Sequence, residues 1–464
     1  MRTLSLALRN LLRNRRRSLT TLLAMILGLV AVLLFGGFIR DITYQLQSDY
    51  VQRTGHFQIQ RKGYFRYGTG NPAVYGIPAY EGILSSLRND PVVAPMLAVA
   101  TPTLQFGGIA GNFAAGVSRT VYASGVVVDD QARMEEWNDY HRRVLRQHLA
   151  LSGTGPDGAV IGTGVARVLG LCAALGVPDC VPPKETSSPV GAALPDDIAS
   201  LSSTAESAST ASAGASGPRI EILASNARGA PNVTAVSVVR AEFQGIKELD
   251  DVYVGLHLAK AQRLIFGNGP PQVTAIAVQL LHTAQMPEAR ARLEALLREA
   301  KRDDLEVIDY ETLNPFYGQT LSMFAAIFGF VSILIGAVVL FTIGNTMSMT
   351  VVERTVEIGT VRALGLRRAG VRRMFFAEGL VLGSLGCVIG IIASILLAWL
   401  VNALGFTWTP PARIEPAPFA VRVAGEYLMI VLAAFGLVVV ASLSAILPAA
   451  RASRMNIVDA LRHV

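Results

Sequence analysis

Four long stretches of this sequence contain no Asp, Glu, Lys or Arg, and they limit the possible folds more than any other feature. They lie at 18–39, 312–352, 379–402 and 427–450. Because an α-helix rises about 1.5 Å per residue, about 20 apolar residues suffice to cross the roughly 30 Å of hydrocarbon in a membrane. The sequence therefore predicts four transmembrane helices, the second of them at 318–352.

The composition supports this interpretation. Of the 464 residues, 51% are hydrophobic and 16% are charged, whereas soluble domains carry about 25% charged residues. An intrinsically disordered chain is excluded, because such chains combine low hydrophobicity with high net charge. The first stretch has 22 uncharged residues, more than the roughly 7–15 apolar residues of a signal peptide, so we expect an uncleaved membrane anchor.

Positive charge is concentrated in the short segments beside these stretches. Residues 1–17, 353–378 and 451–464 together hold 15 Lys or Arg and four Asp or Glu. The segment 40–317 holds 24 Lys or Arg and 28 Asp or Glu. Cytoplasmic segments of membrane proteins carry such an excess of basic residues, so we expect both termini in the cytoplasm. Residues 40–317 and the connector 403–426 then lie outside. No nucleic-acid partner is expected, because a basic surface for nucleic acid belongs on a folded domain.

The predicted external segment, 40–317, has the pattern of a mixed α/β domain. Runs rich in β-branched residues at 234–239 and 273–280 predict strands, and 287–302 predicts a helix. Within the segment 186–218, 26 of 33 residues are Ser, Thr, Ala, Gly or Pro. Such a segment buries too little to offset its ordering entropy, so we expect a flexible insertion. The fold class is thus one transmembrane helix, a large extracytoplasmic α/β domain and three more helices.

The N-terminal segment 1–17 has its own helical pattern. Its leucines gather mainly on one side and its arginines on the other. An amphipathic helix lying on the inner leaflet is one interpretation, and a simple cytoplasmic extension of the first span is the other.

Motifs for catalysis, metal binding and cofactor binding are missing from the sequence. It has no phosphate-binding Gly-x-x-x-x-Gly-Lys-Ser/Thr loop and no paired metal-ligand spacing, so no catalytic, cofactor or metal residues are predicted. Gly162 and Gly164 suggest a dinucleotide fingerprint, but Arg167 replaces its third glycine, so a turn before a short helix is preferred. Cys172 and Cys180 form either a local disulfide, which we favour, or two buried thiols.

Four glycines in the third predicted span are spaced to allow close helix packing. Gly379 and Gly383 form one small-xxx-small pair, and Gly386 and Gly390 form a second. Such pairs let two helix backbones approach closely. The partner helix can belong to the same chain or to a second copy.

The segment between the second and third spans mixes charges at helical spacing. Glu353 and Glu357 are four residues apart, and Gly359 and Gly365 allow the backbone to turn or to be approached closely. An amphipathic helix and a solvated connector are both compatible with this pattern.

The segment 353–365 resembles the signature of FtsX-like, or MacB-like, permeases of type VII ABC transporters. Other parts of the chain are similar to this family at the expected distances. The matching residues are Glu353-Arg354-x-x-Glu357-Ile358-Gly359-x-x-Arg362-Ala363-Leu364-Gly365, Asn345, Met347, Glu378-Gly379-Leu380, Pro448–Arg454 and Asp459–Arg462. Residues 160–170 resemble the family's strand-turn-helix, and 243–251 are similar to a segment of its lipoprotein-releasing branch.

This resemblance implies a permease subunit of the bacterial inner membrane, without enzymatic activity of its own. A separate ABC ATPase, holding ATP and Mg²⁺, would contact Glu353, Arg354, Glu357 and Arg362, while Gly359 and Gly365 shape the turn. Solvation and lipid headgroup contact are the alternative roles of these charges.

The resemblance also implies further partners. A second permease chain, as homodimer or heterodimer, membrane lipid and a periplasmic carrier or adaptor are expected. The function would be lipoprotein release or export of an envelope substrate. An FtsX-type envelope regulator that controls a periplasmic hydrolase is the alternative.

Overall fold

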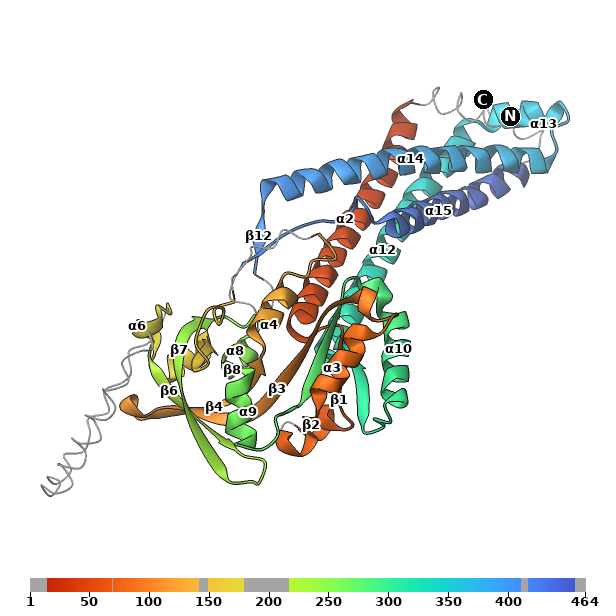
Figure 1. Ribbon diagram of the computed structural model, residues 1–464. Helices are drawn as coiled ribbons and strands as arrows, with labels where there is room; N and C mark the ends of the chain where they lie inside the picture. Colours follow the sequence, from red (N-terminus) through yellow and green to blue (C-terminus); the bar gives the residue numbers. More distant parts are fainter. Residues whose placement is uncertain (1–14, 69, 142–148, 179–216, 410–415, 455–464) are drawn as a thin grey trace, which may run out of the picture. The chain divides into compact units, whose positions relative to one another are not determined.

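The computed structural model describes residues 15–68, 70–141, 149–178, 217–409 and 416–454 (Figure 1). The chain divides into two compact units. We call residues 1–46, 316–408 and 416–464 the membrane unit, and residues 47–315 with 409–415 the α/β domain. Each is described by itself.

The membrane unit is built from long helices. They are α2 (Arg15–Thr54), α12 (Pro315–Glu353), α14 (Arg368–Leu404) and α15 (Tyr427–Arg454). Within the residues described, these are the four helices long and apolar enough to cross a membrane, as the sequence predicted. Smaller elements are α13 (Thr355–Ala363) and the paired strands β12 (Thr407–Trp408) and β13 (Ala417–Pro418).

The helices extend beyond the uncharged stretches that predicted them. Helix α2 continues past Ile39, and Asp41 and Tyr44 there have partners elsewhere in the membrane unit. Asp41 Oδ1 accepts a hydrogen bond from Arg422 Nε at 3.1 Å, and Tyr44 donates one to Glu426 at 2.6 Å. Paired charges allow a helix to continue where unpaired charges would be costly.

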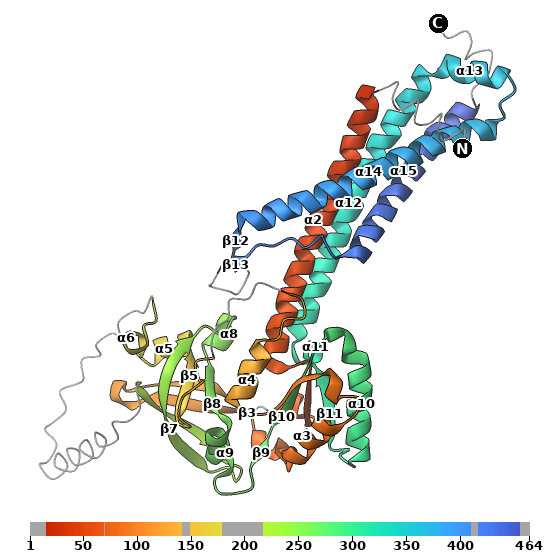
Figure 2. The same ribbon diagram turned by 45° about the horizontal axis from the view of Figure 1, so that its top comes forward.

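The four glycines of α14 lie at contacts within the chain. Helix α14 runs beside α15 (Figure 2), and a Cβ atom at Gly383 would lie 3.1 Å from Ala441 Cβ of α15. On α2, Leu29 Cδ2 would lie 2.9 Å from a Cβ atom at Gly390. Gly379 and Gly386 meet α15 and α2 in the same way. One small-xxx-small pair therefore serves each neighbouring helix.

We expect Gly390→Leu to lower the thermal unfolding midpoint of the full chain, because overpacking costs about 1–3 kcal/mol. Gly436→Leu is the matched control, since a Cβ atom at Gly436 on α15 would meet nothing within 4 Å. Thermal unfolding of both variants in detergent measures the difference. Equal midpoints would show that the α2–α14 contact contributes little.

The α/β domain contains a nine-stranded sheet in the order β11-β1-β10-β3-β4-β8-β5-β7-β6. Its pairs are antiparallel except for β4–β8 and β5–β7. The strands are β1 (Phe57–Arg61), β3 (Leu97–Asn112), β4 (Val117–Val126), β5 (Gly158–Gly162), β6 (Arg219–Ser225), β7 (Pro231–Glu242), β8 (Tyr253–His257), β10 (Ala275–Leu280) and β11 (Leu305–Asp309). The predicted mixed α/β architecture is confirmed.

Short helices and a two-stranded ribbon complete this domain. The ribbon pairs β2 (Ile77–Pro78) with β9 (Gln272–Val273). The α-helices are α3 (Tyr80–Asn89), α4 (Val128–Glu135), α5 (Thr163–Val168), α6 (Cys172–Leu175), α8 (Lys247–Asp250), α9 (Leu258–Phe266), α10 (Met286–Glu299) and α11 (Tyr310–Leu313). A π-helical turn, η1 (Tyr64–Gly68), and the 3₁₀ turns η2 (Pro72–Tyr75), η3 (Ala94–Met96), η4 (Phe113–Ala115) and η6 (Thr283–Gln285) lie between them.

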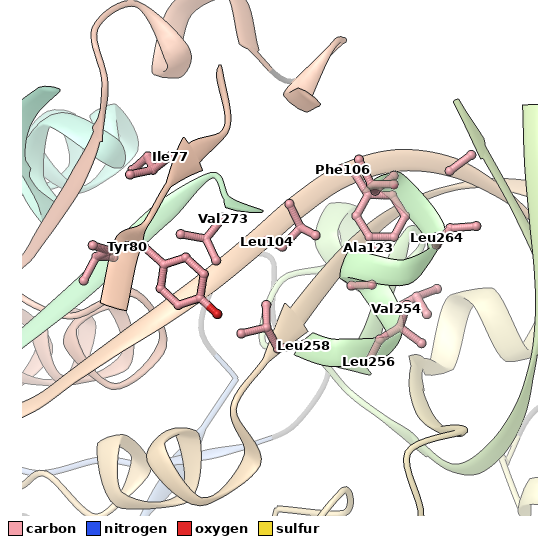
Figure 3. Close-up of a cluster of buried hydrophobic side chains, with 14 of the residues drawn as sticks. Ile77, Tyr80, Leu104, Phe106, Ala123, Val254, Leu256, Leu258, Leu264 and Val273 are labelled. Carbon is pink, nitrogen blue, oxygen red and sulfur yellow. The ribbon is translucent and has the colours of Figure 1, made fainter. Parts of the chain in front are cut away.

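One apolar core lies where α9 packs on the sheet (Figure 3). Strand residues such as Leu104 and Phe106 meet Leu258 and Leu264 of α9. The buried positions of α9 recur every three or four residues, as expected of an amphipathic helix. Gly125 of β4 permits the close approach, because a Cβ atom there would lie 2.5 Å from Ala261 Cβ.

The turn at Gly162 and Gly164 has a structural cause. As predicted, a strand, β5, is followed directly by a short helix, α5. A Cβ atom at Gly162 would lie 1.9 Å from the Asp250 carbonyl oxygen. The buried Asp250 carboxylate accepts hydrogen bonds from the amides of Thr163 at 2.8 Å and Gly164 at 2.9 Å. These glycines therefore admit α8 against the start of α5.

Several predictions fall on residues that the structure does not describe. They are the helix within 1–14, most of the insertion 186–218, the bridge from Cys172 to Cys180, prolines 410 and 411, and Asp459–Arg462. These stay predictions.

Candidate ATPase-coupling site

The segment after α12 forms a helix, α13, with one buried side, and not an open connector. Thr355, Ile358 and Gly359 are buried on one side of it. Val356 and Val361 are each 43% exposed, and Leu364, just after the helix, is 83% exposed. This helix therefore presents a partly apolar outer surface.

Arg354 is buried in an ion-pair network directly before α13. Its Nη1 lies 3.0 Å from Glu378 Oε1, and its Nε lies 3.0 Å from Glu357 Oε2. The side chain of Glu378 is 3% exposed and that of Arg354 is 11% exposed. Buried charges persist in proteins when they are paired and hydrogen-bonded. Arg354 thus joins the start of α13 to α14.

This geometry corrects the expected role of Arg354. The sequence placed it among four charges facing an ATPase, but its guanidinium is enclosed by acids of its own chain. Glu378 was not a predicted site residue, because it lies 24 positions away and helical spacing cannot reveal the pair. The side chain of Glu357 is 48% exposed, Glu353 is exposed and Arg362 is half-buried. These three remain at or near the surface.

The two glycines of the segment have different roles. Gly365 has φ of +98°, in the region that favours glycine, and its N–H donates to the Arg362 carbonyl at 3.0 Å. It ends α13 before α14 begins at Arg368. Gly359 lies inside α13 and is buried, so the expectation that it shapes the turn is wrong.

The end of α15 packs beside the same junction. Arg372 Nε donates to the hydroxyl of Ser453 at 3.1 Å, which joins α14 to α15. Ala449 and Ala452 are buried in the apolar core of the membrane unit. Small residues in the Pro448–Arg454 segment therefore let α15 approach the base of α14 closely.

The family described as FtsX-like permease C-terminal matches residues 326–457. This range holds most of α12 and all of α13, α14 and α15. Residues 326–457 are an FtsX-like permease domain. The resemblance inferred from the 353–365 segment is confirmed, and the Arg354–Glu378 pair lies inside the matched range.

The chain is also similar to several curated membrane proteins. The chain is 36% identical over 140 residues to the ABC transporter permease YtrF of Bacillus subtilis, covering 29% of this chain and 31% of the relative. It is 28% identical over 243 residues to the lipoprotein-releasing system transmembrane protein LolC of Neisseria meningitidis, covering 50% of this chain and 56% of the relative. It is 28% identical over 185 residues to the macrolide export ATP-binding/permease protein MacB of Brucella abortus, covering 38% of this chain and 28% of the relative.

These matches span about a third to a half of the relatives' lengths. Together with the FtsX-like range and the four long apolar helices, they support a membrane location for this chain.

A second group of buried polar residues lies in the α/β domain, where the end of α2 joins the sheet. Gln47 donates to the Tyr310 hydroxyl at 2.8 Å and accepts from the Tyr140 hydroxyl at 2.7 Å. His56 is fully buried, and its Nδ1 accepts from the Leu280 amide at 3.0 Å. Burial lowers the pKa of His56 to about 4, so the ring is neutral at physiological pH. This group fixes the helix end to the sheet.

Glu135 gives the α/β domain a pH-dependent stability. Burial, reinforced by Glu242, raises its pKa to about 7, above the ordinary 4.5, although Arg53 opposes the shift. The folded chain therefore keeps a proton that the unfolded chain releases between these values. The resulting stability is present below about pH 4.5 and is lost as pH rises through about 7.

We expect Glu135→Gln to raise the thermal unfolding midpoint by about 2–6 °C at pH 8 and to change it little at pH 4.5. Glutamine resembles the protonated acid, so the variant removes only the cost of the charge. Thermal unfolding scans of the full chain at both pH values measure this. A shift of equal size at both would show that Glu135 does not hold the proton.

Proposed function

We propose that this chain is the permease subunit of an ABC transporter and that a separate ATPase docks on the outer surface of α13. The observation that carries the proposal is a helix with a partly apolar exposed side inside an FtsX-like domain, joined to α14 by a buried ion pair. Glu353, Glu357 and Arg362 supply charge around this surface, and Leu364 supplies apolar area. ATP and Mg²⁺ would be bound by the ATPase.

The contacts around α13 support transmission of movement. A force on α13 reaches α14 through Arg354 and Glu378, which lie 3.0 Å apart. Helix α14 in turn packs through its glycines on α2 and α15, so the helices move together. Helix α2 continues into the α/β domain, where Gln47 and its partners hold its end. The movement of the ATPase would thus act on the α/β domain.

The uncharged spans agree with this mechanism. Transporters that move ions or polar substrates through the bilayer usually need ionisable groups at membrane depth. The predicted spans 18–39, 318–352, 379–402 and 427–450 contain no Asp, Glu, Lys, Arg or His. We therefore propose that the chain works on a substrate outside the bilayer, in lipoprotein release or export of an envelope substrate.

The family resemblance also suggests the assembly that we propose. It holds two permease chains in the inner membrane with their termini in the cytoplasm, and a periplasmic carrier or adaptor receives the substrate. Among the curated relatives, LolC is named for lipoprotein release and MacB for macrolide export.

Co-purification of the ATP-binding subunit with variants of this chain tests the docking surface. We expect Glu357→Arg and Leu364→Asp each to reduce the retained ATPase at least about ten-fold, since interface anchors cost about 2 kcal/mol or more when lost. Leu364 is 83% exposed, so its replacement leaves the core unchanged. Arg373→Glu, an exposed charge reversal on α14, is the control. Unchanged retention of ATPase by both α13 variants, with normal membrane insertion, would refute the docking assignment.

A further inference from the structure

A pocket of about 210 Å³ lies where the end of α12, the start of α13 and α15 come together. Its lining residues all belong to the membrane unit. They are Ser348, Val351, Val352, Thr355, Pro448 and Arg451.

The pocket combines apolar walls with one charged residue. Val351 and Pro448 are buried, and the Thr355 hydroxyl is already used, since it donates to the Val352 carbonyl at 2.7 Å. Arg451 is exposed, and over the described part of the chain no ion pair joins it to an acidic side chain. Its guanidinium is thus available to an anion beside an apolar wall.

The surroundings favour a lipid over other anions. The pocket lies at the ends of membrane-crossing helices, at the level of the arginine-rich segments 353–378 and 451–454. Basic pockets between transmembrane helices bind the headgroups of anionic lipids, and a single Arg is attracted to an anionic leaflet. We propose that this pocket binds an anionic phospholipid, with its phosphate on Arg451 and the start of its acyl chain against Val351 and Val352.

Lipid binding to the purified full chain tests this assignment without any ATPase. The probes are phosphatidylglycerol and phosphatidylcholine with the same acyl chains, and native mass spectrometry counts the bound lipids. We expect phosphatidylglycerol to bind preferentially and Arg451→Gln to weaken its binding about five-fold. Arg454→Gln is the matched control, because Arg454 is equally basic and exposed on the last turn of α15 but does not line the pocket. It should change binding less than about two-fold.

A second variant separates the apolar wall from the charge. Val352→Trp keeps every arginine and narrows the pocket, so it should weaken the binding of both lipids. The proposal is overturned if the two lipids bind equally, or if Arg451→Gln and Arg454→Gln have equal effects. It is also overturned if Arg451→Gln leaves the lipid count unchanged, because the guanidinium would then not hold the phosphate.

Discussion

Arg354→Met is expected to destabilise the membrane unit by about 3–5 kcal/mol and to release the ATPase, because it removes the guanidinium that pairs with the buried Glu378 carboxylate. Glu378 is 3% exposed, so water cannot replace the guanidinium. Thermal unfolding of the full chain in detergent and co-purification of the ATP-binding subunit measure the two effects.

Two double variants identify the cause. Arg354→Met with Glu378→Met removes both charges, and replacing a buried pair by apolar residues is often neutral, so stability and ATPase retention should largely return. Exchange of the charges, Arg354→Glu with Glu378→Arg, should restore part of the stability and part of the ATPase retention. If the Met–Met variant is as unstable as Arg354→Met alone, the pair is not what joins α13 to α14.

The membrane helices could be predicted from the sequence because a charge in hydrocarbon is costly, so its absence marks each span. The helix ends could not be predicted in the same way. Helix α2 carries Asp41 past the end of its uncharged stretch, and the charge that pairs with Asp41 is on Arg422. A partner so distant in sequence leaves no local pattern.

The coupling site shows the same limit. The spacing of Glu353 and Glu357 indicated helical structure, and the resemblance indicated a docking role. Neither could show that Arg354 faces inward, because that depends on Glu378 reaching it from α14. Burial depends on tertiary structure. Only the structure therefore distinguishes Arg354, which joins α13 to α14, from the charged residues at the surface.

The α/β domain was predicted as a class but not as a topology. Strands at 234–239 and 273–280 follow from β-branched residues, and β7 and β10 cover most of them. The parallel pairing of β4 with β8 joins Tyr122 to Tyr253, and nothing local to either strand specifies it. Such long-range pairing depends on how the whole sheet buries its apolar face.

Asp250→Ala is the second change from which we expect a large effect, a marked fall in the stability of the α/β domain. The carboxylate of Asp250 is fully buried and accepts from three amides, those of Thr163, Gly164 and Gln244 at 2.8, 2.9 and 3.2 Å. Each buried amide left without an acceptor costs about 1–3 kcal/mol, so several kcal/mol are lost. Thermal unfolding and limited proteolysis of the full chain should show an α/β domain that opens while the membrane unit stays inserted.

Asp251→Ala is the matched control for this change, because the neighbouring aspartate offers its main-chain carbonyl to Arg119 at 3.3 Å and the substitution keeps that carbonyl. The stability of Asp250→Asn should lie between those of the two alanine variants. Its side-chain amide keeps one acceptor oxygen but turns a donor toward the Gly164 or Thr163 amide. If Asp250→Ala were no less stable than Asp251→Ala, the close packing of Gly162 and Gly164 on α8 would suffice to hold the turn. The turn at Gly162 and Gly164, whose sequence resembles a nucleotide-binding loop, would then be held by backbone packing alone.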